Sequence, residues 1–178
     1  MKLIRSLVLL LPLLLMGCVA FERDAPDCPR FAIVSGVDEV TLFKPGLTRS
    51  ESDITSRAAI LSAEGVCRRD GDGVRVESKL TLLAEKGTAF AGGEQTYRYF
   101  VALLDPAGSL IAKRRFETVL PFEPEETSTI SVEDIEQIIP AKNDVSSCTV
   151  LFGFDLDPDQ LEYNRKRRDP YRDLDFPL

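Results

Sequence analysis

The sequence predicts an all-β protein, mainly antiparallel, built as an immunoglobulin-like or similar β-sandwich with one or two short helices. Three observations predict this fold class. Apolar and polar residues alternate over long stretches, Gly and Asp cluster between those stretches, and helical spacing is confined to two short segments. Six or seven short strands joined by tight turns are typical of a sandwich.

The clearest predicted strand runs over residues 73–84. Its apolar residues occupy every second position, and Arg75, Glu77 and Lys79 fall between them. A period of two over this length predicts a half-buried strand. The preceding segment, Asp70 to Gly73, is typical of a tight turn and joins it to a strand expected over residues 57–68.

Further strands are expected at residues 30–34, 96–104, 110–122 and 149–156. The segment 96–104 is aromatic and nearly apolar at its end, as in a central strand buried on both faces. The turn at Asp105–Gly108 makes residues 110–122 its hairpin partner. The pair Gly92-Gly93 is also expected to form a hairpin connection.

Two short helices are predicted in the second half of the chain. The first is expected over residues 131–139, where an apparent capping box precedes an apolar stripe that stops at Pro140. The second is expected to begin after Asp157, because Pro158 follows this N-cap and Gln160 lies three residues beyond it.

The longest basic cluster in the sequence is formed by Arg165, Lys166, Arg167 and Arg168. Cations suit the negative end of a helix dipole, so we expect the second helix to end here. The cluster could also dock on an acidic protein partner, a phosphate-bearing lipid or an anionic patch of the same chain, which makes it a candidate partner-binding site. Residues 169–178 are expected to form a flexible C-terminal tail.

The N-terminal residues have the features of an export signal. Lys2 and Arg5 give a basic start, and the run from Leu7 to Met16 is apolar, interrupted only by Pro12. A membrane-spanning helix needs about 20 apolar residues, so this run is too short to span. It fits the basic and apolar regions of a secretory signal.

The segment Leu15-Met16-Gly17-Cys18 resembles the lipobox of bacterial lipoproteins. The resemblance implies that a diacylglycerol is attached to the Cys18 sulfur and that residues 1–17 are removed as a signal peptide. Residues 18–29 would then be a lipidated tether, and residues 30–168 the sandwich domain. Several acyl chains hold far more firmly than one. The alternative is ordinary secretion with Cys18 as a structural thiol.

Two further features bear on location. Val19 rather than Asp follows Cys18, which by the sorting rule of enteric bacteria points to the outer membrane. The β-rich remainder also resembles small, largely uncharacterised envelope lipoproteins of Gram-negative bacteria. That resemblance carries no catalytic residues, and the covalent lipid is the one cofactor-like group that we expect.

Three cysteines remain after Cys18. Export places them in an oxidising compartment, where a disulfide is expected. We favour Cys28–Cys67, because antiparallel pairing of residues 30–34 with 57–68 would bring the start of one strand beside the end of the other. The pairing Cys67–Cys148 is the alternative. With the favoured pairing, Cys148 is expected to be a free, buried and inert thiol.

Composition excludes several function classes. The chain has no His, which excludes Ser-His-Asp and Cys-His catalysis and zinc sites that need imidazole. Without residues 1–17 the chain has 161 residues and a net charge of −9, which argues against a nucleic-acid partner. We expect no metal site: Asp155, Asp157, Asp159 and Glu162 could offer oxygen ligands to Ca²⁺, but Pro158 interrupts them and a helix cap explains Asp157.

These observations predict a non-catalytic, lipid-anchored interaction or scaffolding module on the periplasmic face of the outer membrane, with an envelope protein as partner. Two alternatives stay open: a binding module for a small apolar or glycan ligand between the sheets, and a hydrolase that uses a carboxylate pair. A filled core without a polar cleft favours the scaffold, whereas a deep apolar cavity favours the ligand binder.

Overall fold

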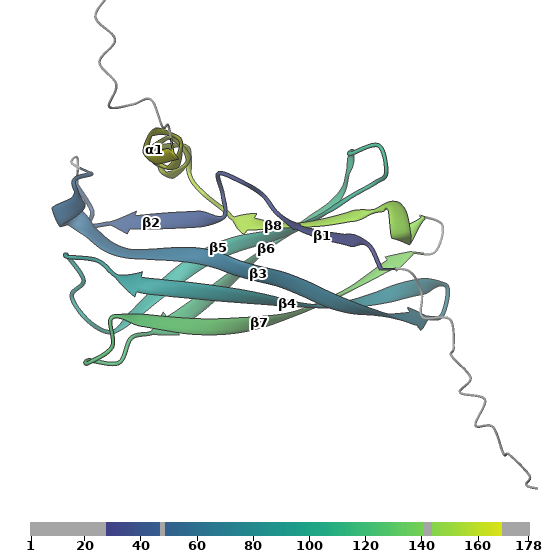
Figure 1. Ribbon diagram of the computed structural model, residues 1–178, viewed down its shortest axis with the longest axis horizontal. Coiled ribbons are helices and arrows are strands. Elements are labelled where there is room, and N and C mark those ends of the chain that lie inside the picture. Colours follow the sequence, from purple (N-terminus) through teal and green to yellow (C-terminus); the bar gives the residue numbers. More distant parts are fainter. Residues whose placement is uncertain (1–27, 47–48, 141–143, 169–178) are drawn as a thin grey trace, which may run out of the picture.

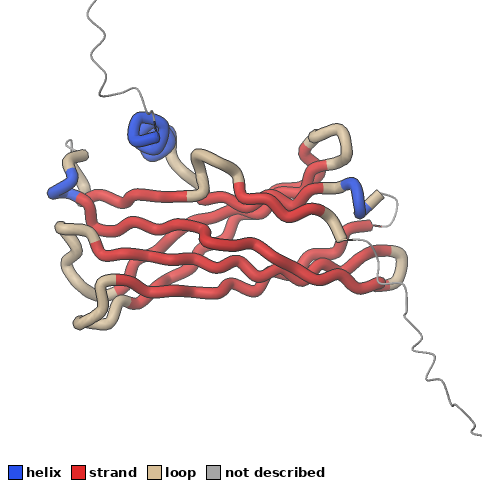
Figure 2. The backbone as a smooth tube through the Cα atoms, viewed as in Figure 1, coloured by secondary structure: helices blue, strands red, loops and turns tan. Residues whose placement is uncertain are grey.

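The computed structural model describes residues 28–46, 49–140 and 144–168. The predicted signal peptide, Cys18, all but the end of the predicted tether and the C-terminal tail lie outside the described residues. Eight strands form two stacked sheets (Figures 1 and 2), which confirms the predicted all-β sandwich.

Each sheet has four strands. Sheet A has the order β1-β8-β5-β6 and sheet B the order β2-β3-β4-β7. The strands are β1 (Arg30–Ile33), β2 (Glu39–Phe43), β3 (Ile54–Asp70), β4 (Gly73–Lys86), β5 (Glu94–Leu104), β6 (Leu110–Pro121), β7 (Ser128–Pro140) and β8 (Thr149–Phe154). The helix α1 spans Pro158–Arg168, and single 3₁₀ turns lie at Glu51–Asp53 and Val145–Ser147.

The core lies between the sheets and follows the predicted alternation. The apolar residues of β4 that share one face are all buried: Val74, Val76, Leu80, Leu82 and Ala84. Opposite them, β5 contributes Tyr97 and Tyr99. Strand β8 contributes Val150, Phe152 and Phe154, each of which is at most 1 % exposed. Since fully burying such a side chain is worth about 1.5–3 kcal/mol, this interior is the main stabilising element.

The first strand does not pair as predicted. We expected residues 30–34 to lie antiparallel to residues 57–68, but β1 pairs in parallel with β8 in the opposite sheet. The chain then crosses to sheet B at Gly36, whose φ of 91° favours glycine. It continues as β2, a strand that the sequence analysis missed and that pairs antiparallel with β3.

The predicted turns hold with one exception. Asp70 lies opposite Gly73 in the β3–β4 hairpin of sheet B, and Asp105–Gly108 closes the β5–β6 hairpin of sheet A. Gly92-Gly93 does not form a hairpin, because it joins β4 of sheet B to β5 of sheet A. Each hairpin therefore stays within one sheet, and the connection between β4 and β5 carries the chain from one sheet to the other.

The helix predicted over residues 131–139 is wrong. These residues belong to β7, which pairs antiparallel with β4 over thirteen positions. Ile135 and Ile139 face the core, whereas Ile138 is 55 % exposed on the other side. The segment is rich in β-branched residues, which fit a pleated half-buried surface better than a helix.

The second predicted helix is confirmed as α1. The Asp157 carboxylate accepts a hydrogen bond from the Gln160 backbone N–H at 2.7 Å, and the Gln160 side chain accepts one from the Asp157 N–H at 2.9 Å. This reciprocal pair is the expected capping box. The helix includes the basic cluster as far as Arg168, the last residue that the structure describes.

The faces of β7 can be checked by substitution. We expect Ile135→Ala to lower the free energy of unfolding by about 2–5 kcal/mol, because it leaves a void between the sheets. The matched change Ile138→Ala should cost about 0.5 kcal/mol or less, since that side chain faces solvent. Urea unfolding followed by circular dichroism measures both. Similar losses for the two variants would contradict the strand assignment, because only a helix places both on one stripe.

Candidate functional site

Exposed apolar side chains gather on the outer face of sheet B. Of the eight large hydrophobic residues that are exposed in the described part of the chain, five lie on this face. They are Leu61, Val66, Ile130, Val132 and Ile138, each at least 50 % exposed. Single apolar residues are common on surfaces, whereas larger exposed apolar patches are typical of interaction sites.

The register of the strands arranges this face in rows. Ile130 lies opposite Leu83, and Val132 lies opposite Thr81 in the next row. Leu61 lies nearby on β3, at an irregularity between Ile60 and Ser62. Leu61, Leu83, Ile130 and Val132 together form an apolar surface beside the first residues of β7.

A charged groove of about 830 Å³ follows along the same face. Its first row is Glu64, Lys79 and Asp134, and its second row is Val66, Glu77 and Glu136, taken across β3, β4 and β7. Sheet A contributes nothing to its lining, so the groove lies outside the core.

Part of the charge in this groove is already balanced. Glu136 is hydrogen-bonded to Arg75, and Glu77 lies 3.4 Å from Arg68. Asp134 has no ion-pair partner among the described residues. The face therefore combines exposed apolar residues with a carboxylate, on its outermost strand, that forms no ion pair within the described chain.

The basic cluster predicted to bind a partner is largely engaged within the chain. Arg167 pairs with Glu39, Arg168 lies 2.6 Å from Asp38, and Lys166 lies 2.6 Å from Glu162 on the same helix. Of the alternatives considered for this cluster, these contacts match the anionic patch of the same chain.

Hydrogen bonds fix α1 beside β2. The buried Asn164 amide donates to the backbone oxygens of Gly36 and Glu39 at 3.0 and 2.7 Å. In the sequence, Asp38 lies between Gly36 and Glu39, the two residues that Asn164 contacts. Burial acts to raise its pKa, but the hydrogen bonds from Arg168 and from backbone N–H groups outweigh burial and lower the pKa below 3.8. We call this set of contacts the helix latch.

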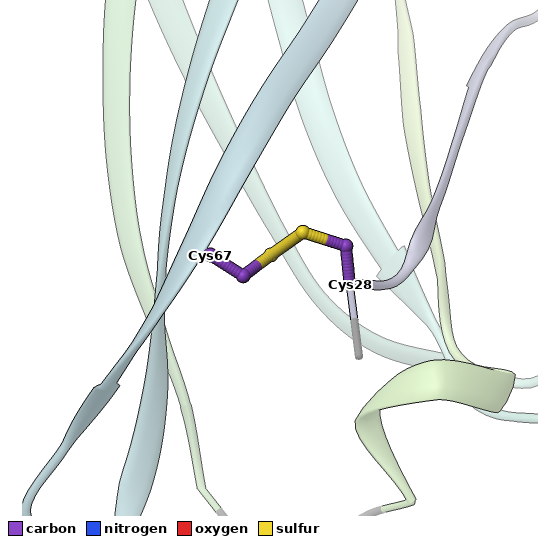
Figure 3. Close-up of a disulfide and its surroundings, with 2 residues drawn as sticks. All are labelled: Cys28 and Cys67. Carbon is purple, nitrogen blue, oxygen red and sulfur yellow. A yellow bond between two sulfur atoms is a disulfide. The ribbon is translucent and has the colours of Figure 1, made fainter. Parts of the chain in front are cut away.

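The disulfide Cys28–Cys67 is present, with Cα atoms 5.6 Å apart (Figure 3). The predicted pairing is thus confirmed. The predicted reason is wrong, because the bridge joins Cys28, two residues before β1 of sheet A, to β3 of sheet B. Cys148 is a free thiol and fully buried. Burial, with the charges of Asp144 and Asp105, raises its pKa, as expected for an inert thiol.

A second hollow, of about 620 Å³, lies between β2, the first half of β5 and the start of α1. It contains Arg49, Arg98, Asp155 and Asp157, so it is the polar cleft to compare with a hydrolase site. Its carboxylates have structural partners: Asp155 lies 2.8 Å from Arg115, and Asp157 caps α1. A pair held in this way is poorly placed for acid–base catalysis.

Neither a metal site nor a membrane-spanning helix is found in the part of the chain that the structure describes. No group of three or more His, Cys, Asp or Glu side chains there could hold a metal ion. Likewise, none of its helices has the length and apolar character needed to span a bilayer.

Comparison with known proteins adds no relative. No protein-family model, curated protein or solved structure matches the chain.

The helix latch gives a stability prediction. We expect Asn164→Ala to lower the free energy of unfolding by about 1–3 kcal/mol, because two carbonyl oxygens lose their donor. Amide hydrogen exchange in α1 should become faster. Arg165→Ala is the matched control, since this side chain forms no hydrogen bond or ion pair with the described residues, and should change neither quantity. Unchanged exchange in Asn164→Ala would contradict a latching role.

The same exchange measurement has a defined pH dependence. Because the pKa of Asp38 is lower in the folded chain, its pair with Arg168 stabilises fully above the unfolded pKa near 3.8. The contribution is lost as pH falls through the folded pKa, so α1 should exchange faster at pH 3, after correction for intrinsic exchange, than at pH 6. Asp38→Asn should flatten this dependence.

The disulfide gives a second stability prediction. The double variant Cys28→Ser with Cys67→Ser should lose about 2–4 kcal/mol of unfolding free energy, because it opens a loop spanning 39 positions in the sequence. Chemical unfolding under non-reducing conditions measures the loss. Cys148→Ser is the control for thiol removal and keeps the bridge. A double variant as stable as the parent would show that the bridge is not stabilising.

Proposed function

We propose that the protein is a non-catalytic interaction module of the bacterial cell envelope, held by a lipid on Cys18 at the periplasmic face of the outer membrane. The observation that carries the interaction role is the outer face of sheet B. That face holds most of the exposed large apolar side chains of the described chain.

The lipid anchor rests on the residues of the N-terminus. A basic start, a short apolar run and the lipobox-like segment ending in Cys18 support export and lipidation. The disulfide is consistent with an exported chain, since such bonds persist in oxidising compartments. The partner would be an envelope protein.

The non-catalytic role rests on the chemistry that the residues offer. The sequence has no His, and Cys148 is buried with a raised pKa. The carboxylates of the polar hollow are bound to cations or to a helix cap. The same hollow supports a second candidate, binding of a small polar ligand such as a glycan, because Phe43 lines it beside the polar groups.

The anchor is tested by Cys18→Ala. Metabolic labelling with a palmitate analogue and membrane fractionation should show loss of the label and release from the membrane, because Cys18 is the proposed site of acylation. Cys148→Ala should retain both. A Cys18→Ala chain that stays labelled and membrane-bound would overturn the lipoprotein assignment.

The interaction role is tested on the same anchored chain. An envelope protein that co-purifies with the detergent-extracted parent should be lost in Leu61→Asp with Ile130→Asp, which adds charge to the apolar surface. Val119→Asp, on an exposed position of β6, is the matched control. Equal recovery of the partner with all three chains would place its binding site elsewhere.

A further inference from the structure

Strand β7 has one hydrogen-bonded neighbour, β4, among the described residues, so its other edge is free. Immediately before β7, the Lys86 backbone N–H donates to the Thr127 oxygen at 2.8 Å. These two residues continue the register in which Glu85 lies opposite Ser128. Residues 86 and 127 are therefore a hydrogen-bonded pair, and such pairs recur at every second residue of an antiparallel ladder.

The backbone groups at the free edge follow from this alternation. Odd-numbered residues of β7 bond to β4, so the N–H and C=O groups of its even-numbered residues point to the free edge. These residues are the ones whose side chains form the outer face: Ile130, Val132, Asp134, Glu136 and Ile138. A strand added at this edge would thus meet a row of unpaired backbone groups and the exposed apolar residues together.

The charged side chains of β7 limit which kind of strand can pair with its free edge. The strand contains Glu133, Asp134 and Glu136 and no Lys or Arg. In antiparallel pairing with a second copy, the three registers with greatest overlap place Glu133 on Glu133, Asp134 on Asp134, or Asp134 on Glu136. Like charges directly opposite one another are unfavourable, so a second copy is a poor occupant of this edge.

Building on the proposed interaction role, we propose that β7 binds an extended segment of a partner protein as an added strand, and that this segment carries Lys or Arg flanked by apolar residues. The basic residues lie opposite Asp134 and Glu136, and the apolar residues lie opposite Val132 and Ile138. Asp134 is the main selector, because Glu136 already accepts a hydrogen bond from Arg75. Backbone hydrogen bonds hold the segment, and the side chains set its specificity.

A defined peptide tests this assignment. The probe is a nine-residue peptide, blocked at both ends, in which threonine alternates with valine, lysine, lysine and valine in that order. The side-chain order is symmetric, so it suits parallel or antiparallel addition. The comparison peptide has glutamate in place of both lysines. Fluorescence anisotropy with the lipidated full chain in detergent micelles should show at least tenfold tighter binding of the lysine peptide.

Three variants locate the binding. Asp134→Lys should reverse the preference in favour of the glutamate peptide, whereas Glu125→Lys, the same charge change in the β6–β7 loop, should keep the preference for lysine. Val132→Pro should abolish binding of both peptides while the sheet stays folded by circular dichroism, because the lost N–H points to the free edge.

Specific results would overturn the assignment. Equal affinity for the two peptides, or lysine-peptide binding that survives Val132→Pro, would exclude charge-selected strand addition. Dimerisation of the full chain in sedimentation that is abolished by Val132→Pro would identify a second copy as the occupant. If the peptide fails but an envelope protein still co-purifies with the anchored chain, strand addition is wrong and the interaction role stands. If both fail, the interaction role fails as well.

Discussion

The pairing of β4 on both of its edges is the constraint on which the rest of the molecule depends. The strand is held by β3 over fourteen positions and by β7 over thirteen. Since side chains alternate strictly along a strand, these two registers decide which residues of three neighbouring strands enter the core. A shift of one position would bury Lys79 and Asp134 and expose Leu80 and Ile135. The apolar core and the exposed face are therefore two results of one register.

The sequence predicted the fold class because alternation is a local signal. In β4 the alternation is interrupted only at Ser78 and Leu83, and the five apolar residues of its buried face were all predicted. In β7 it was hidden, since Ile138 and Ile139 are adjacent and Ser131–Asp134 imitates a helix start. Pairing with β4 makes this segment a strand rather than a helix, and the spacing of apolar residues alone does not reveal this long-range interaction. The misassigned segment then concealed the candidate site, because its exposed residues had been placed on a helix stripe.

Features of the charged residues and cysteines that depend on sequence neighbours were predicted, whereas those that depend on long-range contacts were not. The Asp157 cap and the helix that follows it were predicted, since both depend on neighbours within a few residues. The partners of Arg167 and Arg168 lie at Glu39 and Asp38, more than a hundred residues away, and no local pattern indicates them. The disulfide was assigned correctly for a reason that proved wrong, because proximity of Cys28 to Cys67 arises across the two sheets rather than along one ladder.

The Cys28–Cys67 bridge also determines how the molecule would carry mechanical load. Tension on the N-terminal chain reaches the domain at Cys28, two residues before a strand that pairs over four positions with β8. Under this load, the hydrogen bonds between β1 and β8 would break one after another, because so few of them hold β1. The bridge transfers the load to β3, a strand of seventeen residues that pairs with β4 over fourteen positions. Force is then shared by the interior of sheet B, and the weakest pairing of the sandwich is shielded from it.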